Sequence, residues 1–168
     1  MRSTTLRSIL TLAIAVIIGC VAPSLAAADV QGFMKIPGLP GESTNDRHAG
    51  EIDLVSYTQQ AGTAACFKAI VVKGLDKASP GLALLAVTNQ VVSPITITLS
   101  KSAAEPVDVF TATLENVVVG NVELVEVDGG PVPTERVTLR PRKATLSYRP
   151  QKADGSLDAP VVAVINCP

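Results

Sequence analysis

The sequence is poor in the residues that most enzyme sites need. Its 168 residues include one histidine, no tryptophan, two tyrosines and three phenylalanines. A Ser-His-Asp triad or a histidine metal site would have to use His48, and neither a Gly-x-Ser-x-Gly motif nor a second histidine accompanies it. We interpret His48 as a polar turn residue whose ring bonds the loop backbone. The shortage of aromatic rings argues against a stacking platform for sugars or bases. We expect no enzyme activity, no cofactor and no metal.

An excess of basic charge is also absent. Fourteen Lys and Arg residues face fifteen Asp and Glu residues, which gives a formal net charge of −1. Gly38, Gly41 and Gly50 do not form a phosphate cradle, because no Lys-Ser/Thr pair and no helix follow them. A mildly acidic chain is not attracted to a phosphate backbone, so we expect no nucleic-acid binding.

Long hydrophobic runs are missing except near the N-terminus. Arg2 and Arg7 precede an apolar run, Ile9 to Ile18, and small residues then lead to a cleavage motif at Ala26-Ala27-Ala28. This order of charged, apolar and small residues is typical of a secretory signal peptide, which we predict to be residues 1–28. The apolar run is shorter than the roughly 20 residues that a membrane-spanning helix needs.

A second processing route is open at Cys20. Ile17-Ile18-Gly19-Cys20 resembles the lipobox of bacterial lipoproteins, in which the cysteine is acylated and becomes the new N-terminus. Either route leads out of the cytoplasm. We expect a periplasmic or secreted protein of a Gram-negative bacterium, or alternatively one that is lipid-anchored in the envelope. Cleavage after Ala28 leaves 29–168 as a single domain without a membrane span.

Only three cysteines are present. Cys20 is either discarded with the leader or lipidated, which leaves Cys66 and Cys167. Two thiols in an oxidising compartment predict a disulfide, which would close most of the mature chain into one loop. The alternative is two buried free cysteines.

Hydrophobic residues alternate with polar ones in segment after segment. Ile95-Thr96-Ile97-Thr98-Leu99 is the clearest case, with Ile and Leu on one face and Thr on the other. Such alternation predicts strands with one buried face, and clusters of Gly, Pro, Asn and Asp separate them. The predicted strands are Val30 to Ile36, Glu51 to Gln59, Cys66 to Lys73, Ile95 to Lys101, Val107 to Glu115, Val117 to Val127, Val137 to Tyr148 and Val161 to Ile165.

One segment has helical signals instead. The apolar stretch Gly81 to Val87 follows Ser79, which we predict to be the N-cap, and Pro80 at the first helical position. Asn89 is suited to end the helix. Many short strands with one helix indicate a mainly β fold, a small sandwich or closed barrel with the helix packed on one side or end.

Several sequence segments, in the same order along most of the mature chain, resemble segments of one protein family. They are Phe33 to Ser43, His48 to Tyr57, Lys73 to Pro80, Pro133 to Leu139 and Tyr148 to Gly155. These strings resemble the haemolysin-coregulated protein (Hcp) family, which supplies the tube protein of bacterial type VI secretion systems.

The resemblance implies a β-barrel of two packed sheets flanked by one α-helix. It also implies a non-enzymatic structural or carrier protein that self-associates as a ring of six copies, stacks into a tube, and binds secreted effectors or secretion-apparatus proteins. Two groups of residues match family motifs. They are a loop with Gly41, Glu42, Ser43, His48, Gly50 and Glu51, and the turn into the helix with Asp76, Lys77, Ser79 and Pro80.

Two features depart from the family pattern. Tube-forming relatives assemble inside the cytoplasm and normally carry no signal peptide. Many relatives also have a long Gly-rich loop where this chain has only Thr58 to Ala65. Our leading hypothesis is an exported Hcp-like protein, stabilised as an individual domain by its disulfide. Two alternatives stay open: an authentic tube subunit whose translation begins at Met34, and a small envelope hydrolase or ligand-binding lipoprotein that uses His48.

Overall fold

The computed structural model describes residues 29–63, 66–102, 106–125, 133–152 and 154–168. The predicted signal peptide and Cys20 lie outside these residues. The described chain has ten strands and one helix: β1 (Val30–Lys35), β2 (Ile52–Gly62), β3 (Cys66–Gly74), α1 (Ser79–Thr88), β4 (Val91–Val92), β5 (Ile95–Lys101), β6 (Val107–Glu115), β7 (Val117–Val125), β8 (Thr134–Arg140), β9 (Lys143–Tyr148) and β10 (Val161–Asn166).

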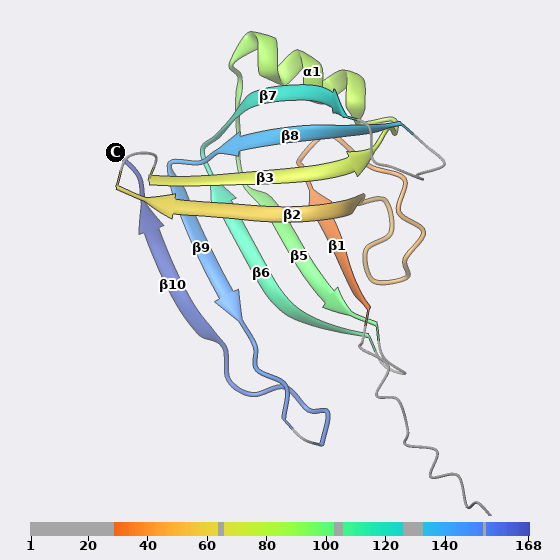
Figure 1. Cartoon of the computed structure of the whole chain (residues 1–168), viewed down its shortest axis with the longest axis vertical. Coiled ribbons are helices and arrows are strands. Elements are labelled where there is room, and N and C mark those ends of the chain that lie inside the picture. The colour runs from red at the N-terminus through yellow and green to blue at the C-terminus, as the bar shows by residue number, and fades with distance from the viewer. Residues whose placement is uncertain (1–28, 64–65, 103–105, 126–132, 153) are drawn as a thin grey trace, which may run out of the picture.

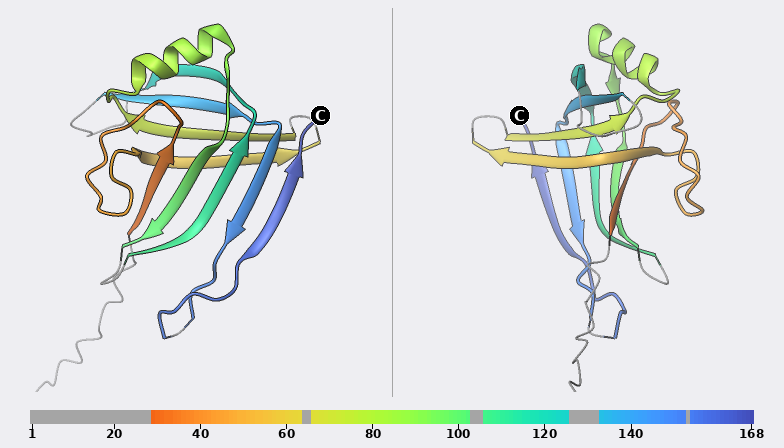
Figure 2. Two further views of the ribbon diagram at one scale, coloured as in Figure 1. Left: turned by 180° about the vertical axis from the view of Figure 1, so that it is seen from behind. Right: turned by 45° about the vertical axis from the view of Figure 1, so that its right-hand side comes forward.

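The strands form one antiparallel sheet in the order β10-β9-β6-β5-β1-β2-β3-β8-β7-β4. β1 pairs with β5 on one side and with β2 on the other, so it joins the two halves of the sheet. Figures 1 and 2 show that β2, β3, β8 and β7 cross over the layer made by β1, β5, β6, β9 and β10. The predicted mainly β architecture with one helix is confirmed, and its two packed layers are halves of a continuous sheet.

The core lies between these two layers. Alternate residues of β3 point inward, which buries Phe67, Ala69 and Val71 completely or almost completely. Met34 of β1 and Ile97 of β5 are fully buried from the other layer. The alternation that predicted the strands therefore also identifies the residues that form the core.

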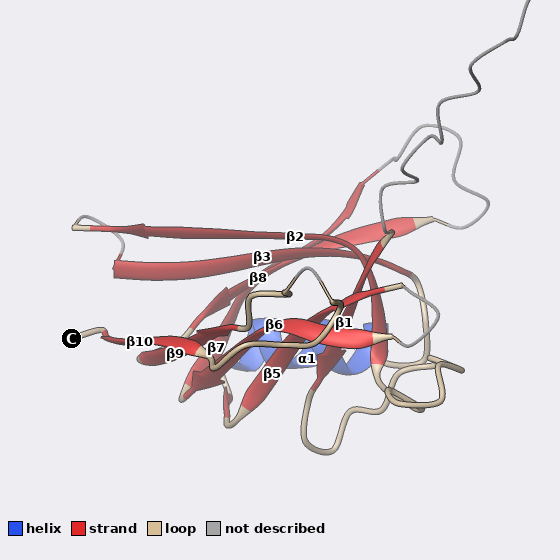
Figure 3. Cartoon of the chain, turned by 90° about the horizontal axis from the view of Figure 1, so that it is seen from below, coloured by secondary structure: helices blue, strands red, loops and turns tan. Residues whose placement is uncertain are grey.

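The helix α1 packs on the outside of one layer, where it contacts β7. Figure 3 shows it as the only helix among the described strands. Leu82 and Leu85 are its buried residues, and Asn89 ends it with a left-handed φ of 52°. The predicted N-cap is wrong by one position, since Ala78 is the N-cap and Ser79 is already helical. The hydroxyl of Ser79 is used in another contact, described below.

Two strand boundaries also differ from prediction. The segment predicted as one strand from Val137 to Tyr148 is two, β8 and β9, because Pro141 has no N–H with which to continue a ladder. β2 extends to Gly62 and pairs with β3 as far as Cys66, so most of the expected loop after Tyr57 is strand. The two-residue strand β4 had no alternation long enough to predict it.

Among the described residues, no helix is long and apolar enough to span a membrane.

Candidate functional surfaces: the motif loop, the helix turn and the sheet edges

The loop between β1 and β2 is held closed by its own backbone. The amide of Gly41 donates to the Gly50 carbonyl at 2.8 Å, and the amide of Gly50 donates to the Ser43 carbonyl at 2.9 Å. Ser43 in turn donates its amide to the Glu51 carbonyl at 3.0 Å. A Cβ at Gly41 would lie 2.2 Å from the Glu51 carbonyl oxygen, so only glycine fits where the two arms of the loop meet.

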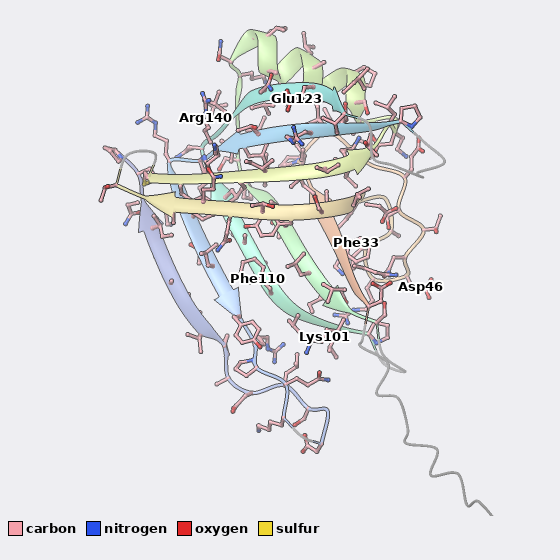
Figure 4. All side chains as sticks on the ribbon, viewed as in Figure 1. Phe33, Asp46, Lys101, Phe110, Glu123 and Arg140 are labelled. Atoms are coloured by element: carbon pink, nitrogen blue, oxygen red, sulfur yellow. A yellow bond between two sulfur atoms is a disulfide. The ribbon has the colours of Figure 1, made fainter. Side chains whose placement is uncertain are left out.

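His48 fastens this loop to the sheet. Its imidazole is buried and stacks on Phe33 of β1, with ring centroids 4.1 Å apart. Nδ1 lies 3.0 Å from a carboxylate oxygen of Glu51, and Nε2 lies 3.2 Å from a carboxylate oxygen of Asp108 on β6. Figure 4 shows Phe33 on β1 beside the loop that carries Asp46. The prediction that the ring bonds loop backbone is wrong, because both nitrogens face carboxylates.

Asp108 also pairs with a second residue of the loop, Arg47. The guanidinium of Arg47 donates to the other oxygen of the Asp108 carboxylate at 2.8 Å and also bonds the Pro106 carbonyl. Ser43, the nearest hydroxyl in the sequence, accepts a bond from the Asn45 amide through its Oγ. Among the described hydrogen bonds, no hydroxyl pairs with the His48 ring, so the arrangement is an anchor and offers no activated nucleophile.

A buried ion cluster holds the turn into the helix. The ammonium of Lys73, which is fully buried, donates to Asp76 and Glu135 at 2.8 Å each and to the Ser79 hydroxyl at 3.1 Å. The Ser79 hydroxyl donates to Glu135 at 2.8 Å, and its oxygen accepts from the Asp76 amide. Lys73 and Glu135 come from neighbouring strands, β3 and β8, where they face each other in the ladder.

The remaining motif residues have smaller roles. The carboxylate of Glu42 accepts a bond from the Lys77 amide at 3.2 Å, which ties the motif loop to the helix turn. Pro80 occupies the first turn of α1, where a missing N–H has no cost. The sequence analysis named both motifs but did not predict the contacts of His48 with Phe33 and Asp108, or those of Ser79 with Lys73 and Glu135. Lys73 shares the inward face of β3 with Phe67 and Val71, and that alternation was the available signal.

Comparison with known proteins identifies the family. Residues 33–148 match the family model described as "Type VI secretion system effector, Hcp". Protein hcp1 of Pseudomonas aeruginosa is 30% identical over 144 residues, which cover 77% of this chain and 89% of that protein. The chain belongs to the Hcp family.

Solved structures of Hcp proteins share the fold. The Hcp1 crystal structure from Salmonella typhimurium superimposes with a TM-score of 0.71 at 21% identity, covering 83% of this chain and 95% of that one. A type VI secretion system effector from Yersinia pestis gives 0.69 at 23% identity, with coverage of 80% and 98%. Hcp proteins are non-enzymatic tube proteins of type VI secretion that are secreted and form hexameric rings.

Within this Hcp fold, a disulfide joins the two layers. Cys66 begins β3 and Cys167 follows β10, and their sulfur atoms are bonded. The Cys167 amide also donates to the Arg142 carbonyl at 2.7 Å. Because β3 and β10 belong to different halves of the sheet, the bond closes the side of the barrel that lies opposite β1.

The two edges of the Hcp sheet are apolar and exposed. Along β10, Val161 is 66% exposed, and Val162 and Val164 are each 54% exposed. At the other edge, Val91 of β4 is 55% exposed and Leu124 of β7 is 71% exposed. Edge strands with apolar side chains and free backbone groups are suited to pairing with other chains.

Proposed function

We propose that this chain is an Hcp-fold structural or carrier protein that is exported from the cytoplasm. Outside the cytoplasm it self-associates into rings. The observation that carries the proposal is the pairing of Cys66 with Cys167 in a chain of a tube-protein family. A disulfide persists in the periplasm or outside the cell, whereas cytoplasmic thiols are kept reduced.

The leader supports the same location. Arg2 and Arg7 followed by an apolar run and the Ala26-Ala27-Ala28 motif have the order of a secretory signal. A direct test fuses residues 1–28 to an alkaline phosphatase that is active only outside the cytoplasm. We expect enzyme activity, and its loss when Ile9 to Ile18 is interrupted by two lysines. An inactive fusion that is stably produced would contradict export.

Self-association is supported by the two apolar edges. A closed ring needs a heterologous contact, in which one patch of each subunit meets a different patch of the next. β10 provides one patch, with Val161, Val162 and Val164, and α1 and β4 at the opposite end of the sheet provide another, with Leu84, Val87 and Val91. β10 and β4 are the two ends of the sheet order. A ring contact between them would remove both edges from solvent.

Size-exclusion chromatography with light scattering tests the ring. We expect the oxidised protein to elute as a hexamer, and the double variant Val162→Lys/Val164→Lys to elute as a monomer with unchanged circular dichroism. Val55→Lys is the matched control, because Val55 is 57% exposed but lies on β2, outside both patches. A monomeric wild-type protein at high concentration would refute self-association and leave export untouched.

A second candidate function is an authentic type VI tube subunit whose translation begins at Met34. Membership of the tube family favours it. The pairing of β1 argues against it, since that start would remove Val30 to Phe33, which pair with Lys101 to Thr98 of β5. It would also remove Phe33, on which His48 stacks. N-terminal sequencing of the native protein distinguishes the two starts.

A further inference from the structure

A basic cavity lies over the disulfide and has no role in the proposed ring contact. Its volume is about 630 Å³, within the range of small-ligand sites. Lys68, Arg140 and Arg142 line it together with Asn116 and Pro168, and no Asp or Glu is among its described lining. Figure 4 shows Arg140 at the end of β8, on the side where the C-terminus lies. The overall acidity of the chain makes such a cluster stand out.

The three cations are not neutralised by the described part of the chain. Its ion pairs use other basic residues: Arg47, His48, Lys73, Arg136, Lys143 and Lys152. Lys68 precedes Ala69 and Arg140 follows Leu139, the last ladder pair of β3 and β8. Because the strands are antiparallel, Lys68 and Arg140 lie opposite each other and project from the same face. Like charges opposite each other on neighbouring strands destabilise a sheet. An anion between them would remove that repulsion.

A bulge in the neighbouring strand β7 lies beside Arg140. β7 bulges at Gly120, where its register with β8 shifts between Val119 and Asn121. A Cβ at Gly120 would lie 3.0 Å from Nε of Arg140, so the glycine lets the Arg140 side chain lie close against the β7 backbone.

The disulfide lies next to the other two cations, Lys68 and Arg142. Lys68 is two residues from Cys66 and lies on the same face of β3. The carbonyl of Arg142 accepts the bond from the Cys167 amide, and the Arg142 amide donates to the Glu115 carbonyl. The covalent link between β3 and the segment after β10 therefore keeps Lys68 and Arg142 on one cavity wall.

We propose that this cavity binds a multiply charged anionic group, carboxylate or phosphate, through Lys68, Arg140 and Arg142. Two guanidinium groups match the paired oxygens of such groups, and the Asn116 amide adds a neutral donor. The proposal depends neither on export nor on ring formation, because all the residues belong to one subunit. Its failure would therefore leave the proposed function standing.

Titration calorimetry of the purified, oxidised protein tests the proposal at constant ionic strength. The two probes are inorganic pyrophosphate and a blocked peptide of six glutamates. We expect saturable binding of at least one probe, weakened at least about tenfold in Arg140→Gln/Arg142→Gln, since each lost charge-assisted bond is worth a factor of that order. Binding of pyrophosphate alone assigns phosphate chemistry, and binding of the peptide alone assigns carboxylate chemistry.

The matched control is Arg136→Gln/Lys143→Gln, which removes the same charge from exposed ion pairs away from the cavity. We expect this variant to bind as the wild type does. Unsaturable heats for both probes would overturn the proposal. An equal loss of affinity in both double variants would also overturn it, because it would show attraction to net charge rather than to the cavity.

Discussion

The imidazole of His48 lies almost flat on the ring of Phe33, with an angle of 9° between the ring planes. This stack places a loop residue against the first strand, and the flanking carboxylates of Glu51 and Asp108 fix the direction of the ring. The only histidine of the chain thus acts as a fastener between the motif loop, β1 and β6.

Replacing His48 by Ala should destabilise the fold by about 2 to 4 kcal/mol, because a buried stack and two hydrogen bonds to carboxylates are lost. Urea unfolding followed by circular dichroism measures the change. Arg47→Ala is the control, since its bond to Asp108 is largely exposed and should contribute less than about 1 kcal/mol. Equal losses in the two variants would contradict the anchoring role of His48.

Gly41→Ala should open the motif loop, because its Cβ would collide with the Glu51 carbonyl and no flexible side chain is there to yield. We expect a loss of about 2 kcal/mol or more and faster amide exchange from Ser43 to Gly50. Gly62→Ala is the matched control, since nothing lies within 4 Å of the added carbon. An unchanged exchange pattern in Gly41→Ala would show that the loop tolerates the displacement.

Lys73→Met should cost about 3 to 5 kcal/mol, because it leaves the buried carboxylate of Glu135 without its cation. The double variant Lys73→Met/Glu135→Leu should recover much of that loss, since it removes both charges. Lys143→Met, whose partner Glu115 is partly exposed, should change the stability by less than about 1 kcal/mol. A double variant no more stable than Lys73→Met would mean that the whole cluster, with Asp76 and Ser79, is indispensable.

Tyr57 is half-buried, and this position predicts how the fold responds to alkaline pH. Burial raises the pKa of Tyr57 from its ordinary value of 10.0. The neutral phenol is favoured in the folded state, so its contribution is fully present below pH 10 and is lost as the pH rises above it. In a Tyr148→Phe background, phenolate absorbance should therefore appear together with unfolding. Phenolate formation before any loss of circular dichroism would show that the partial burial of Tyr57 does not raise its pKa.

The sequence was sufficient for what depends on local pattern. β5 and β6 have the predicted bounds, Ile95–Lys101 and Val107–Glu115, because hydrophobic and polar residues alternate along much of each strand and turn residues flank them. The split of the predicted strand Val137 to Tyr148 was missed, although Pro141 was a signal for it, since proline interrupts a ladder. The partners of His48 and Lys73 were not readable, because Asp108 and Glu135 are some 60 residues away and only the sheet order brings them near. The two cysteines could be paired because few other pairings remained.

The disulfide itself should contribute strongly to stability. Its two cysteines are 101 residues apart, and closing a loop of that length is worth about 4 to 5 kcal/mol in the chain-entropy account. Cys66→Ser/Cys167→Ser should unfold at lower urea concentration and should no longer respond to reductant. A wild-type protein equally stable with and without reductant would show that the bond is dispensable.

The most direct test of the central claim is the intact mass of the native protein, measured in the periplasmic fraction released by osmotic shock and in the remaining cytosolic fraction. An exported, disulfide-bonded Hcp protein predicts a chain that begins at Asp29 and lacks the two thiol hydrogens of Cys66 and Cys167, with no alkylation before reduction. A cytosolic chain that begins at Met34, with both thiols open to alkylation, would contradict the account.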